Sequence, residues 1–441
     1  MSKHKQYDVA TSTLLSTGLE GKRVGYKKTK LGWIPEDWNV KSLDQLGEFS
    51  KGKGITKKDI LEDEVGGLPC VRYAEIYTIY HYNTTVLKSK INQESAANSN
   101  PINCGDILFA GSGETLEDIG KSIAYLNKET AYAGGDICIL KHHNQDPQFL
   151  GYLFNNDVVR SQLYKIGQGH SVVHIYSSGL KKVSVPIPPL PEQQKIASIL
   201  NTWDKAIAAQ EKLIAQKQAL KNGLMQQLLT GKKRFAGFVE EWEEKSLNDI
   251  VKYLGGEAFK STNQVENGVR WLKIANVGIG VVKWGDSTTF LPTSFIDENP
   301  KYVLKAGDAV MALTRPILND KLKIAVFNKE DGIALLNQRV AKLISKNKND
   351  LKFIYYIHQT PYFIYTMNAM MAGTDPPNIS IKDLAKKKVF IPGYEEQKKI
   401  VSVIESFDNE IDNLINKGKH LKKQKQGLMQ QLLTGEKRVK G

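Results

Sequence analysis

The sequence from Glu192 to Arg234, EQQKIASILNTWDKAIAAQEKLIAQKQALKNGLMQQLLTGKKR, decides how the chain is organised. A closely similar sequence, EQKKIVSVIESFDNEIDNLINKGKHLKKQKQGLMQQLLTGEKR, runs from Glu396 to Arg438. Adding 204 to any position in the first copy gives its partner in the second copy without a gap. A long internal repeat constrains the architecture more strongly than any local pattern does. The sequence therefore predicts two similar halves, each of which ends in the same long helix.

Both copies have the pattern of a coiled-coil helix. Neither copy contains proline, and polar residues such as Gln210 and Lys217 interrupt an otherwise apolar seam with alternating steps of four and three. Each copy reaches a glycine, Gly231 or Gly435, followed by Lys and Arg, which suits a helix C-terminus. About 38 helical residues would span roughly 57 Å, and such a helix is marginal alone. We expect the two helices to pack through Ile196, Leu200, Trp203, Ile207, Ile214 and Leu224 of the first copy and Ile400, Ile404, Phe407, Ile411, Leu414, Leu421 and Leu428 of the second.

Composition limits the class of protein. The 441 residues, 41% of them hydrophobic, are enough for two or three domains with real cores. The formal charge of +14 favours a polyanionic partner, most simply nucleic acid. The three cysteines, Cys70, Cys104 and Cys138, form no CxxC pair, which argues against a disulfide framework or a zinc site. With no apolar run near the length of a membrane span and no signal-peptide core, we expect a soluble cytoplasmic protein without membrane contact.

Two segments of mixed pattern precede the two helices. Short β-like runs alternate with glycine-rich turns in both segments, for example CVRYAEIYTIY, GDILFA and DICIL in the first and WLKIANVGIGVVKW, GDAVMAL and KIAVF in the second. The predicted fold is mixed α/β, with two globular α/β domains separated by two long antiparallel coiled-coil helices and related by a pseudo-twofold internal repeat. The predicted parts are an N-terminal leader (1–25), a first domain (26–190), a central helix (191–234), a second domain (235–393) and a C-terminal helix (394–441).

The two domains also correspond to each other internally. Trp38 matches Trp242 at an offset of 204, and we expect both to be core anchors. Gly105-Asp106 matches Gly307-Asp308 at 202, and IAYLNKE from Ile123 matches IAVFNKE from Ile324 at 201. Most other residues differ. This pattern indicates one scaffold that carries two different recognition surfaces.

Two motifs resemble parts of a DNA methyltransferase. FAGSG (109–113) has the form of a glycine loop for S-adenosylmethionine, and DPPN (375–378) resembles the catalytic tetrapeptide of amino-methyltransferases. That tetrapeptide normally ends in an aromatic residue that stacks on the flipped base, whereas this one ends in Asn378. The internal alignment sets residues 110–113 against 312–315, and 375–378 against 171–174, so neither motif is shared between the halves. We therefore interpret both as variable loops, and no other catalytic or metal-binding spacing is present.

The combined pattern resembles the specificity (S) subunit of a type I restriction–modification system over essentially the whole chain. The resemblance is carried by two variable domains introduced by PEDW and EEW, the tracts PIPPLPEQQKI and FIPGYEEQKKI, and two helices that end in GLMQQLLTG. The resemblance implies that each domain is a target recognition domain for one half of an asymmetric, split double-stranded DNA sequence. It implies that the helices act as a spacer and dock two methyltransferase (M) subunits, to which restriction (R) subunits are added.

The resemblance also implies that this chain is not an enzyme and holds no cofactor or metal, because S-adenosylmethionine, ATP and Mg belong to the partner subunits. It leaves open DNA-mimic anti-restriction proteins as further partners. Candidate DNA contacts lie in the loops where the halves diverge. They are Lys51, Lys53, Arg72, Tyr73, Ser112, Glu114, Gln168, His170 and Ser171 in the first domain, and Lys260, Arg270, Lys273, Thr314, Arg315, Lys321, Thr374 and Asn378 in the second. Among them, Arg315 is the strongest candidate for reading guanine.

Two other functions are compatible with parts of the pattern. A protein-binding scaffold on a coiled coil would make the positive charge incidental, and a stand-alone DNA adenine methyltransferase would require the chain itself to bind S-adenosylmethionine. Strong salt dependence of DNA binding would favour the specificity subunit over the scaffold.

Overall fold

The computed structural model describes residues 23–61, 66–115, 117–167, 173–286, 288–373 and 375–439. The chain forms two compact units. Unit 1 consists of the described residues up to Ala209 together with those from Gly418 onward, and unit 2 consists of Gln210–Lys417. Each unit therefore combines one globular domain with part of each long helix.

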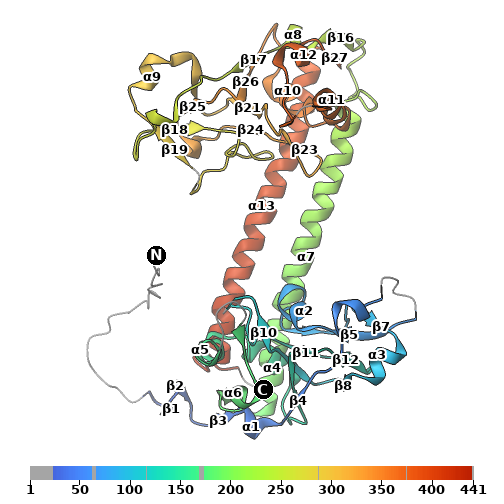
Figure 1. Ribbon diagram of the computed structural model, residues 1–441, viewed down its shortest axis with the longest axis vertical. Helices are drawn as coiled ribbons and strands as arrows, with labels where there is room; N and C mark the ends of the chain where they lie inside the picture. The colour runs from blue at the N-terminus through green and yellow to red at the C-terminus, as the bar shows by residue number, and fades with distance from the viewer. Residues whose placement is uncertain are drawn as a thin grey trace. The chain divides into compact units, whose positions relative to one another are not determined.

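Unit 1 is built around two sheets. The larger has the strand order β4-β13-β9-β11-β6 and the smaller has the order β7-β5-β12-β8. The larger sheet lies near the long helices, and the smaller sheet lies on the side of the unit that also carries α3 (Figure 1). The strands are β4 (Glu48–Lys51), β5 (Leu68–Val71), β6 (Asn83–Thr84), β7 (Ser89–Ile91), β8 (Asn100–Ile102), β9 (Ile107–Ala110), β11 (Ser122–Tyr125), β12 (Ala131–Ala133) and β13 (Ile137–Lys141).

Unit 2 repeats this topology. Its sheets have the orders β17-β26-β21-β24 and β19-β18-β25-β20, and the pairs β5-β12 and β18-β25 are both parallel. The mixed α/β class and the two-domain repeat predicted from the sequence are therefore confirmed. The strands are β17 (Val251–Gly255), β18 (Val269–Leu272), β19 (Thr289–Leu291), β20 (Val303–Leu304), β21 (Ala309–Ala312), β24 (Ile324–Val326), β25 (Ala334–Leu336) and β26 (Val340–Ser345).

Short two-stranded pairs complete the two units. They are β1 (Tyr26–Thr29) with β2 (Gly32–Pro35), β3 (Asn39–Ser42) with β15 (Ser184–Ile187), β10 (Ser112–Gly113) with β14 (Val173–His174), β16 (Glu243–Ser246) with β27 (Lys388–Ile391), and β22 (Ile317–Leu318) with β23 (Lys321–Leu322). The pairs β3-β15 and β16-β27 are equivalent, and each lies beside the start of a long helix in sequence.

The short helices also occur in equivalent sets, except that α2 of unit 1 has no counterpart among the described helices of unit 2. In unit 1 they are α1 (Leu43–Leu46), α2 (Tyr73–Thr78), α3 (Gln93–Ala97), α4 (Pro147–Leu153), α5 (Asp157–Ile166) and α6 (Ser177–Leu180). In unit 2 they are α8 (Leu247–Ile250), α9 (Phe295–Glu298), α10 (Leu351–Ile357), α11 (Pro361–Met371) and α12 (Ile381–Ala385). The long helices α7 (Leu190–Leu228) and α13 (Tyr394–Leu433) each contribute residues to both units. Both are followed by the expected left-handed glycine, Gly231 at φ +70° and Gly435 at φ +75°.

One β-like run proves to be largely helical. The run CVRYAEIYTIY begins as β5, but its residues from Tyr73 onward form α2. The carboxylate of Glu75 accepts a hydrogen bond from the Arg72 backbone N–H at 3.0 Å, which stabilises the first turn of the helix. Glu75 and Ile76 of α2 are buried, and the alternation of apolar and polar residues obscured this helix in the sequence.

The core of each unit joins the larger sheet to the long helices. In unit 1, Phe109 and Leu140 of the sheet belong to the same buried cluster as Ile196 and Leu200 of α7 and Leu432 of α13. In unit 2, Met311 and Leu343 cluster with Leu228 of α7 and with Ile400 and Ile404 of α13. The predicted seam therefore packs on the domains at its ends, through Ile196 and Leu200 of α7 and through Ile400 and Ile404 of α13. Trp203, Ile207 and Ile214 of the seam belong to neither cluster. Trp38 is fully buried, as expected, and Trp242 packs at the edge of its own core.

Within each unit the two helices run antiparallel. In unit 2, Gln210 donates from Nε2 to the Leu414 carbonyl at 2.8 Å, Lys217 pairs with Glu410 at 2.7 Å, and Lys221 pairs with Asp408. The partner's number falls as the number on α7 rises. The polar residues that interrupt the seam are thus cross-helix contacts. Unit 1 has the equivalent pair Lys425–Asp204 at 2.5 Å.

A tyrosine from each domain joins this pair of charges. The hydroxyl of Tyr152 in α4 donates to Asp204 at 2.6 Å, and that of Tyr356 in α10 donates to Asp408 at 3.0 Å. Burial is the main cause of the raised pKa of both phenols, and the adjacent carboxylate raises each pKa further. The equivalent residues of the two units are 204 positions apart in sequence. The internal repeat therefore also covers the polar contacts between each domain and its helices.

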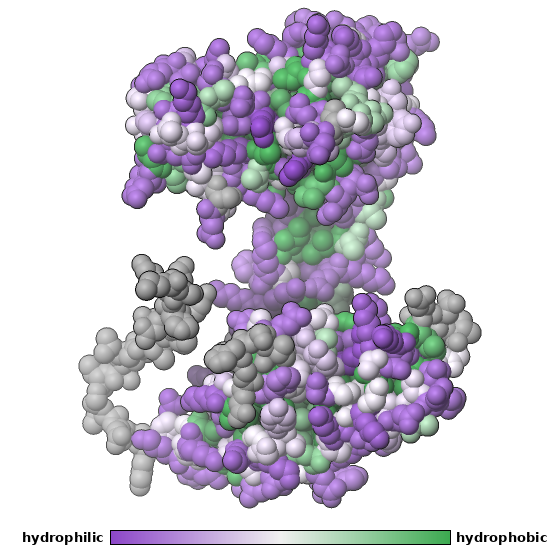
Figure 2. Space-filling model, viewed as in Figure 1, coloured by the Kyte–Doolittle hydropathy of each residue, from purple (hydrophilic) through white to green (hydrophobic). Residues whose placement is uncertain are grey.

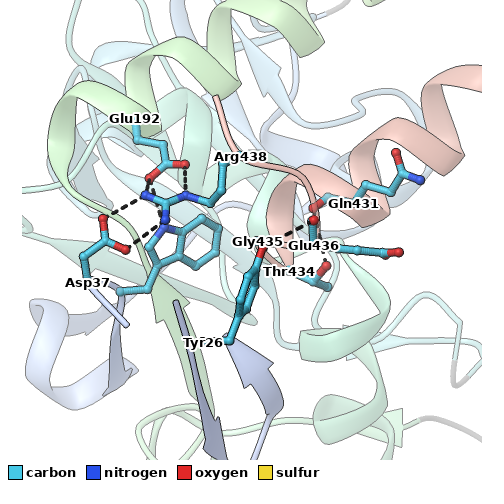
Figure 3. A network of polar contacts seen from close by, with 9 residues as sticks. Tyr26, Asp37, Glu192, Gln431, Thr434, Gly435, Glu436 and Arg438 are labelled. Atoms are coloured by element: carbon cyan, nitrogen blue, oxygen red, sulfur yellow. Dashed lines mark hydrogen bonds and ion pairs between the residues drawn. The ribbon is translucent and has the colours of Figure 1, made fainter. Parts of the chain in front are cut away.

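In unit 1 a second polar network closes the end of α13 on the start of the domain (Figure 3). Arg438 donates to both carboxylate oxygens of Glu192, at 2.8 and 2.9 Å, and to both of Asp37, at 3.0 and 2.8 Å. The Trp38 indole N–H also donates to Glu192, at 2.9 Å. Tyr26 adds a hydrogen bond from its hydroxyl to the Gly435 carbonyl at 2.9 Å. We call Asp37, Trp38, Glu192 and Arg438 the unit 1 clasp.

Unit 2 has a reduced version of the clasp. Arg234 donates to both oxygens of Glu396, at 3.0 and 2.7 Å, as Arg438 does to Glu192. The Trp242 indole N–H is buried without a hydrogen-bond partner, unlike that of Trp38. A buried donor without a partner costs stability, so the two clasps are equivalent in position and unequal in strength.

The surfaces of the units are mainly polar. Hydrophilic side chains cover most of the face of each unit that Figure 2 shows, with smaller apolar areas between them. None of the helices in the described ranges is long and apolar enough to cross a membrane.

Candidate nucleic-acid interface

The first candidate surface lies where β9 of unit 1 runs into its loop. Ser112 stands opposite His174 in the β10-β14 pair, and the Ser112 hydroxyl lies 2.8 Å from His174 Nδ1. Ser112 is only 2% exposed, whereas His174 is partly exposed. The His174 ring lies nearly parallel to that of Tyr176, at 19° with centroids 6.4 Å apart, and Tyr176 is 57% exposed. A buried hydroxyl therefore holds an imidazole at the surface.

The equivalent place in unit 2 has different side chains on the same backbone. Thr314 stands opposite Asn378, and its hydroxyl donates to Asn378 Oδ1 at 2.8 Å. The Ile379 N–H donates to the Leu313 carbonyl at 2.9 Å, as the Ile175 N–H donates to the Gly111 carbonyl at 2.9 Å. The alignment of Ser112 with Thr314 and of His174 with Asn378 is thus confirmed. The motif FAGSG supplies Ser112 to the pair in unit 1, and the motif DPPN supplies Asn378 to the equivalent pair in unit 2.

Arg315 follows Thr314 in an unusual conformation. Its φ is +46°, in the left-handed region, and its N–H donates to the Pro377 carbonyl at 2.7 Å. The residue is exposed. Nearby, the Lys323 N–H donates to the Pro316 carbonyl at 2.7 Å, which holds the β22-β23 hairpin and its exposed Lys321 beside the same loop. Of the residues predicted for unit 2, Thr314, Arg315, Lys321 and Asn378 therefore come together.

Lys51 in unit 1 adjoins the Ser112 loop through Asp136. The Lys51 ammonium lies 3.6 Å from the Asp136 carboxylate, and the Asp136 carbonyl accepts the Gly111 N–H at 2.7 Å. The side chain of Lys51 is 66% exposed, so this ion pair is weak and the charge remains available. Lys53 and Glu114 are also exposed.

Arg72 and Tyr73 are more strongly bound to their own domain. Arg72 forms an ion pair of 2.9 Å with Glu75, which is 3% exposed, and Tyr73 packs against a core cluster beside Tyr77. These contacts hold both side chains against their own domain. Arg72 and Tyr73 nevertheless belong to the α2 region, which contacts β9 and β10.

Three of the DNA contacts predicted for unit 2 are distant from the Thr314 loop in sequence and have different interaction partners. Arg270 donates to the Asp331 carbonyl at 2.6 Å and stacks on Trp284, with its guanidinium 5.1 Å from the ring centroid. Lys273 lies 4.1 Å from the Trp271 ring centroid, and desolvation lowers its pKa. Lys260 is exposed at the start of a 3-10 turn. Gln168, His170, Ser171 and Thr374 lie outside the described residues.

Sequence reasoning did not select several side chains that the structure brings to these loops. His174 and Tyr176 are two, and the pair Lys121 and Lys323 is another. Lys121 donates to the Tyr77 carbonyl at 3.5 Å and Lys323 to the Ile274 carbonyl at 2.5 Å, so they hold equivalent places. Their offset of 202 equals that of Gly105-Asp106, and the repeat is the signal that would have found them.

A metal centre is not visible among the described side chains. No group of three or more His, Cys, Asp or Glu residues in these ranges is arranged to hold a metal ion. Cys70 and Cys138 are buried free thiols, and Cys104 is an exposed one. Burial raises the pKa of Cys70 to about 12 and of Cys138 to about 11, so both thiols are unreactive.

Comparison with known proteins gives a consistent result. A family model described as type I restriction modification DNA specificity domain matches twice, at residues 35–217 and 239–422. The type I restriction enzyme MjaVIII specificity subunit of Methanocaldococcus jannaschii is 31% identical over 421 residues, covering 92% of this chain and 94% of the relative. The putative MjaX specificity subunit of the same organism is 28% identical over 443 residues, covering 95% of this chain and 98% of the relative.

Two solved structures share the fold. One, from a study of complex assembly and conformational transition of the type I R-M system, has a TM-score of 0.59 at 18% identity and covers 92% of this chain and 99% of the other. The S subunit of a type I restriction–modification system from M. genitalium has a TM-score of 0.52 at 16% identity, with 90% and 96% covered.

The duplicated scaffold with unlike loops defines a class of two-domain recognition proteins, and the same DNA specificity domain model matches each half. Within that class, this chain belongs to the family of type I restriction–modification specificity subunits.

Proposed function

We propose that each unit of this chain reads one half of a split, asymmetric double-stranded DNA sequence. The observation that carries the proposal is the contrast between framework and loops. The framework contacts of Tyr152, Asp204 and Lys425 recur at equivalent positions in unit 2. The loop pair on the same backbone changes from Ser112–His174 to Thr314–Asn378. Two unlike reading surfaces on one scaffold suit two unlike half-sites.

Charge supports DNA as the ligand. The chain carries a formal charge of +14, and the loops hold exposed cations such as Lys51, Lys53, Arg315 and Lys321. Lysine contacts to phosphate position a protein on DNA, whereas bidentate contacts to base edges give sequence discrimination. Arg315 has the side chain most suited to guanine, and Asn378 the one most suited to adenine. We therefore assign Arg315 and Asn378 to base reading and the lysines to phosphate contacts.

The long helices have two roles in this proposal. They set the number of base pairs between the half-sites, and their outward faces dock two M subunits, to which R subunits are added. S-adenosylmethionine, ATP and Mg are then held by those partners. Joining two weak readers makes the second contact effectively intramolecular, which raises affinity and makes binding depend on both half-sites.

The decisive experiment is single-molecule methylation sequencing of the source genome with and without the gene. Loss of one split, asymmetric, adenine-methylated motif on deletion is the expected result. Loss of a continuous motif would point to a stand-alone modification enzyme. If no motif changes, DNA binding by the assembled complex decides between an inactive system and a protein-binding scaffold. A specificity subunit loses affinity steeply as salt rises, because bound phosphates release counterions.

A further inference from the structure

We infer that His174 and Asn378 are specificity-determining residues at one shared reading position, and that the buried hydroxyls of Ser112 and Thr314 are their positioning residues. This inference rests on the proposed function and adds to it the separation of the loop residues into readers and supports. His174 belongs to neither methyltransferase-like motif, and Ser112 and Thr314 lie too deep to reach a duplex.

Burial separates the two roles. Ser112 and Thr314 are 2% and 5% exposed, respectively, while His174 is partly exposed and Asn378 is exposed. A hydroxyl that is almost fully buried donates or accepts inside the protein, and here its partner is in each case the outer side chain, at 2.8 Å. The hydroxyl thus fixes the rotation of the side chain that faces solvent. Preorganisation of this kind lowers the entropy that binding must overcome.

The two exposed side chains, His174 and Asn378, offer different hydrogen-bonding groups, as the recognition of two different half-sites requires. Asn378 carries an amide whose Oδ1 accepts the Thr314 hydroxyl at 2.8 Å and has a second lone pair, and an amide matches the N6 donor and N7 acceptor of adenine. His174 is contacted by Ser112 at Nδ1, so Nε2 is the ring nitrogen left for a base edge, and Tyr176 supports the ring face. An imidazole offers a single donor or acceptor, whereas an amide offers both. The two units therefore recognise different base edges from the same backbone position.

The neighbouring residues place charge beside each reader. In unit 2 the left-handed backbone at Arg315 lets its N–H bond to Pro377, in the same two-segment arrangement that holds Asn378. In unit 1 Lys51 reaches the equivalent region through Asp136. A cation next to a hydrogen-bonding reader is the usual arrangement of phosphate and base contacts in a DNA interface.

The test transplants the pair from one unit to the other. In the complex assembled with its M subunits, the double variant Thr314→Ser/Asn378→His places the unit 1 pair on the unit 2 backbone. Methylation is then mapped by single-molecule sequencing. The expected result is a changed or relaxed base at one position of the unit 2 half-site, with the other half-site intact. Asn378→Ala should lower discrimination at that base pair by about 5- to 150-fold, the range of one good bidentate contact.

Variants of the hydroxyl test the positioning role. Thr314→Val removes the hydroxyl and keeps the shape, and it should slow methylation of the motif without changing which bases are read. Thr314→Ser alone should restore the rate. Ser112→Ala and Ser112→Thr form the corresponding pair in unit 1. Asn248→His, on the exposed surface of α8, is the matched control and should leave both motif and rate unchanged.

The outcomes separate this inference from the proposed function. If the wild-type complex methylates no split motif, the proposed function fails. If the wild type methylates a split motif and the transplanted pair leaves every base and the rate unchanged, the inference about these four residues is overturned while the function stands. If the transplant changes both half-sites together, the pair acts through global structure, which also overturns the inference.

Discussion

Single substitutions between the repeats create different sensitivities in the two units. Phe49 and Phe154 of unit 1 are replaced at the offset of 204 by Tyr253 and His358 of unit 2. His358 is fully buried, accepts the Tyr253 hydroxyl at Nε2 over 2.6 Å, and bonds through Nδ1 to the Ile354 carbonyl at 2.7 Å. Burial lowers the pKa of His358 to about 4. The imidazole is therefore neutral in the folded unit.

This histidine should make unit 2 sensitive to acid. Its folded pKa lies below the unfolded value near 6.5, so the unfolded chain takes up the proton first and stability falls as pH drops from about 6.5 towards about 4. The total loss is about 3 kcal/mol. Hydrogen exchange of α10 in the full chain at pH 7.5 and 5, corrected for intrinsic rates, should show about 2 kcal/mol of this loss.

The matched control is the double variant Tyr253→Phe/His358→Phe, which carries the unit 1 pair. It should keep the protection of α10 across this pH range. Equal loss of protection in wild type and double variant would assign the acid sensitivity to carboxylates instead.

The unit 1 clasp gives a second prediction for a single residue. Arg438→Ala leaves Glu192, which is 4% exposed, without its cation. Removing one partner of a buried ion pair is costly, but the Arg438 side chain is 39% exposed, so we expect a loss of about 2–3 kcal/mol. Denaturant unfolding of the full chain measures the loss. Adding Glu192→Gln should recover part of it, because the unpaired charge is removed. If stability is not recovered, the loss comes mainly from the packing of Arg438 on Trp38 and not from the unpaired charge of Glu192.

At the level of elements, the helices were the most predictable part of the molecule. The apolar period and the C-terminal glycines of α7 and α13 are local signals, and both are confirmed. The short elements were less predictable. The residues from Tyr73 were interpreted as a strand because apolar and polar residues alternate there, yet Arg72 and Glu75 begin a helix. The choice between strand and helix at this point depends on the burial of Glu75, whose carboxylate also accepts a hydrogen bond from the Ser89 hydroxyl of β7.

The repeated cross-helix lysines lead to a prediction at this scale. Lys425→Met should destabilise unit 1, and Lys221→Met should destabilise unit 2, because each leaves an Asp bonded to a Tyr without its cation. The carboxylates of Asp204 and Asp408 are about one-third exposed, at 35% and 38%, so we expect roughly 1–2 kcal/mol in each case. Hydrogen exchange should localise each effect to one unit. The exposed Lys419→Met serves as a control, and equal effects in both units would contradict the assignment.

At the scale of the whole molecule, the sequence predicts architecture better than it predicts the site. The repeat needs only the comparison of the chain with itself, and the strand order that the two units share, apart from the additional β6 of unit 1, bears it out. The site depends on which loop residues face each other across 60 positions or more, as Ser112 and His174 do. Ser112, Thr314, Arg315 and Asn378 were identified because the halves diverge there. Arg270 was predicted to lie in a loop where the halves diverge, whereas it belongs to β18 and is bound by Trp284 and Asp331, and no local signal revealed these partners.

The helices yield a prediction for the complete complex. Inserting seven residues after Ala209 in α7 and seven after Lys417 in α13 preserves the heptad phase and adds about 10 Å of helix. If the helices set the spacing of the half-sites, the methylated motif should gain about three base pairs of spacer with both half-sites unchanged. Methylation mapping provides the measurement. Insertion into α7 alone should abolish methylation, and an unchanged spacer in the double insertion would refute the role of the helices.

The division of the chain also orders events during synthesis. Unit 2 is one continuous stretch, whereas unit 1 needs residues from Gly418 onward that are translated after all of unit 2. On the ribosome, residues 23–209 must wait for Arg438 before Glu192 and Asp37 gain their counter-ion. Translation at about 5–20 residues per second makes that wait roughly 11–46 seconds. During this interval the nascent first domain exposes the apolar surface that Leu432 and Leu433 later cover, and a chaperone can bind that surface.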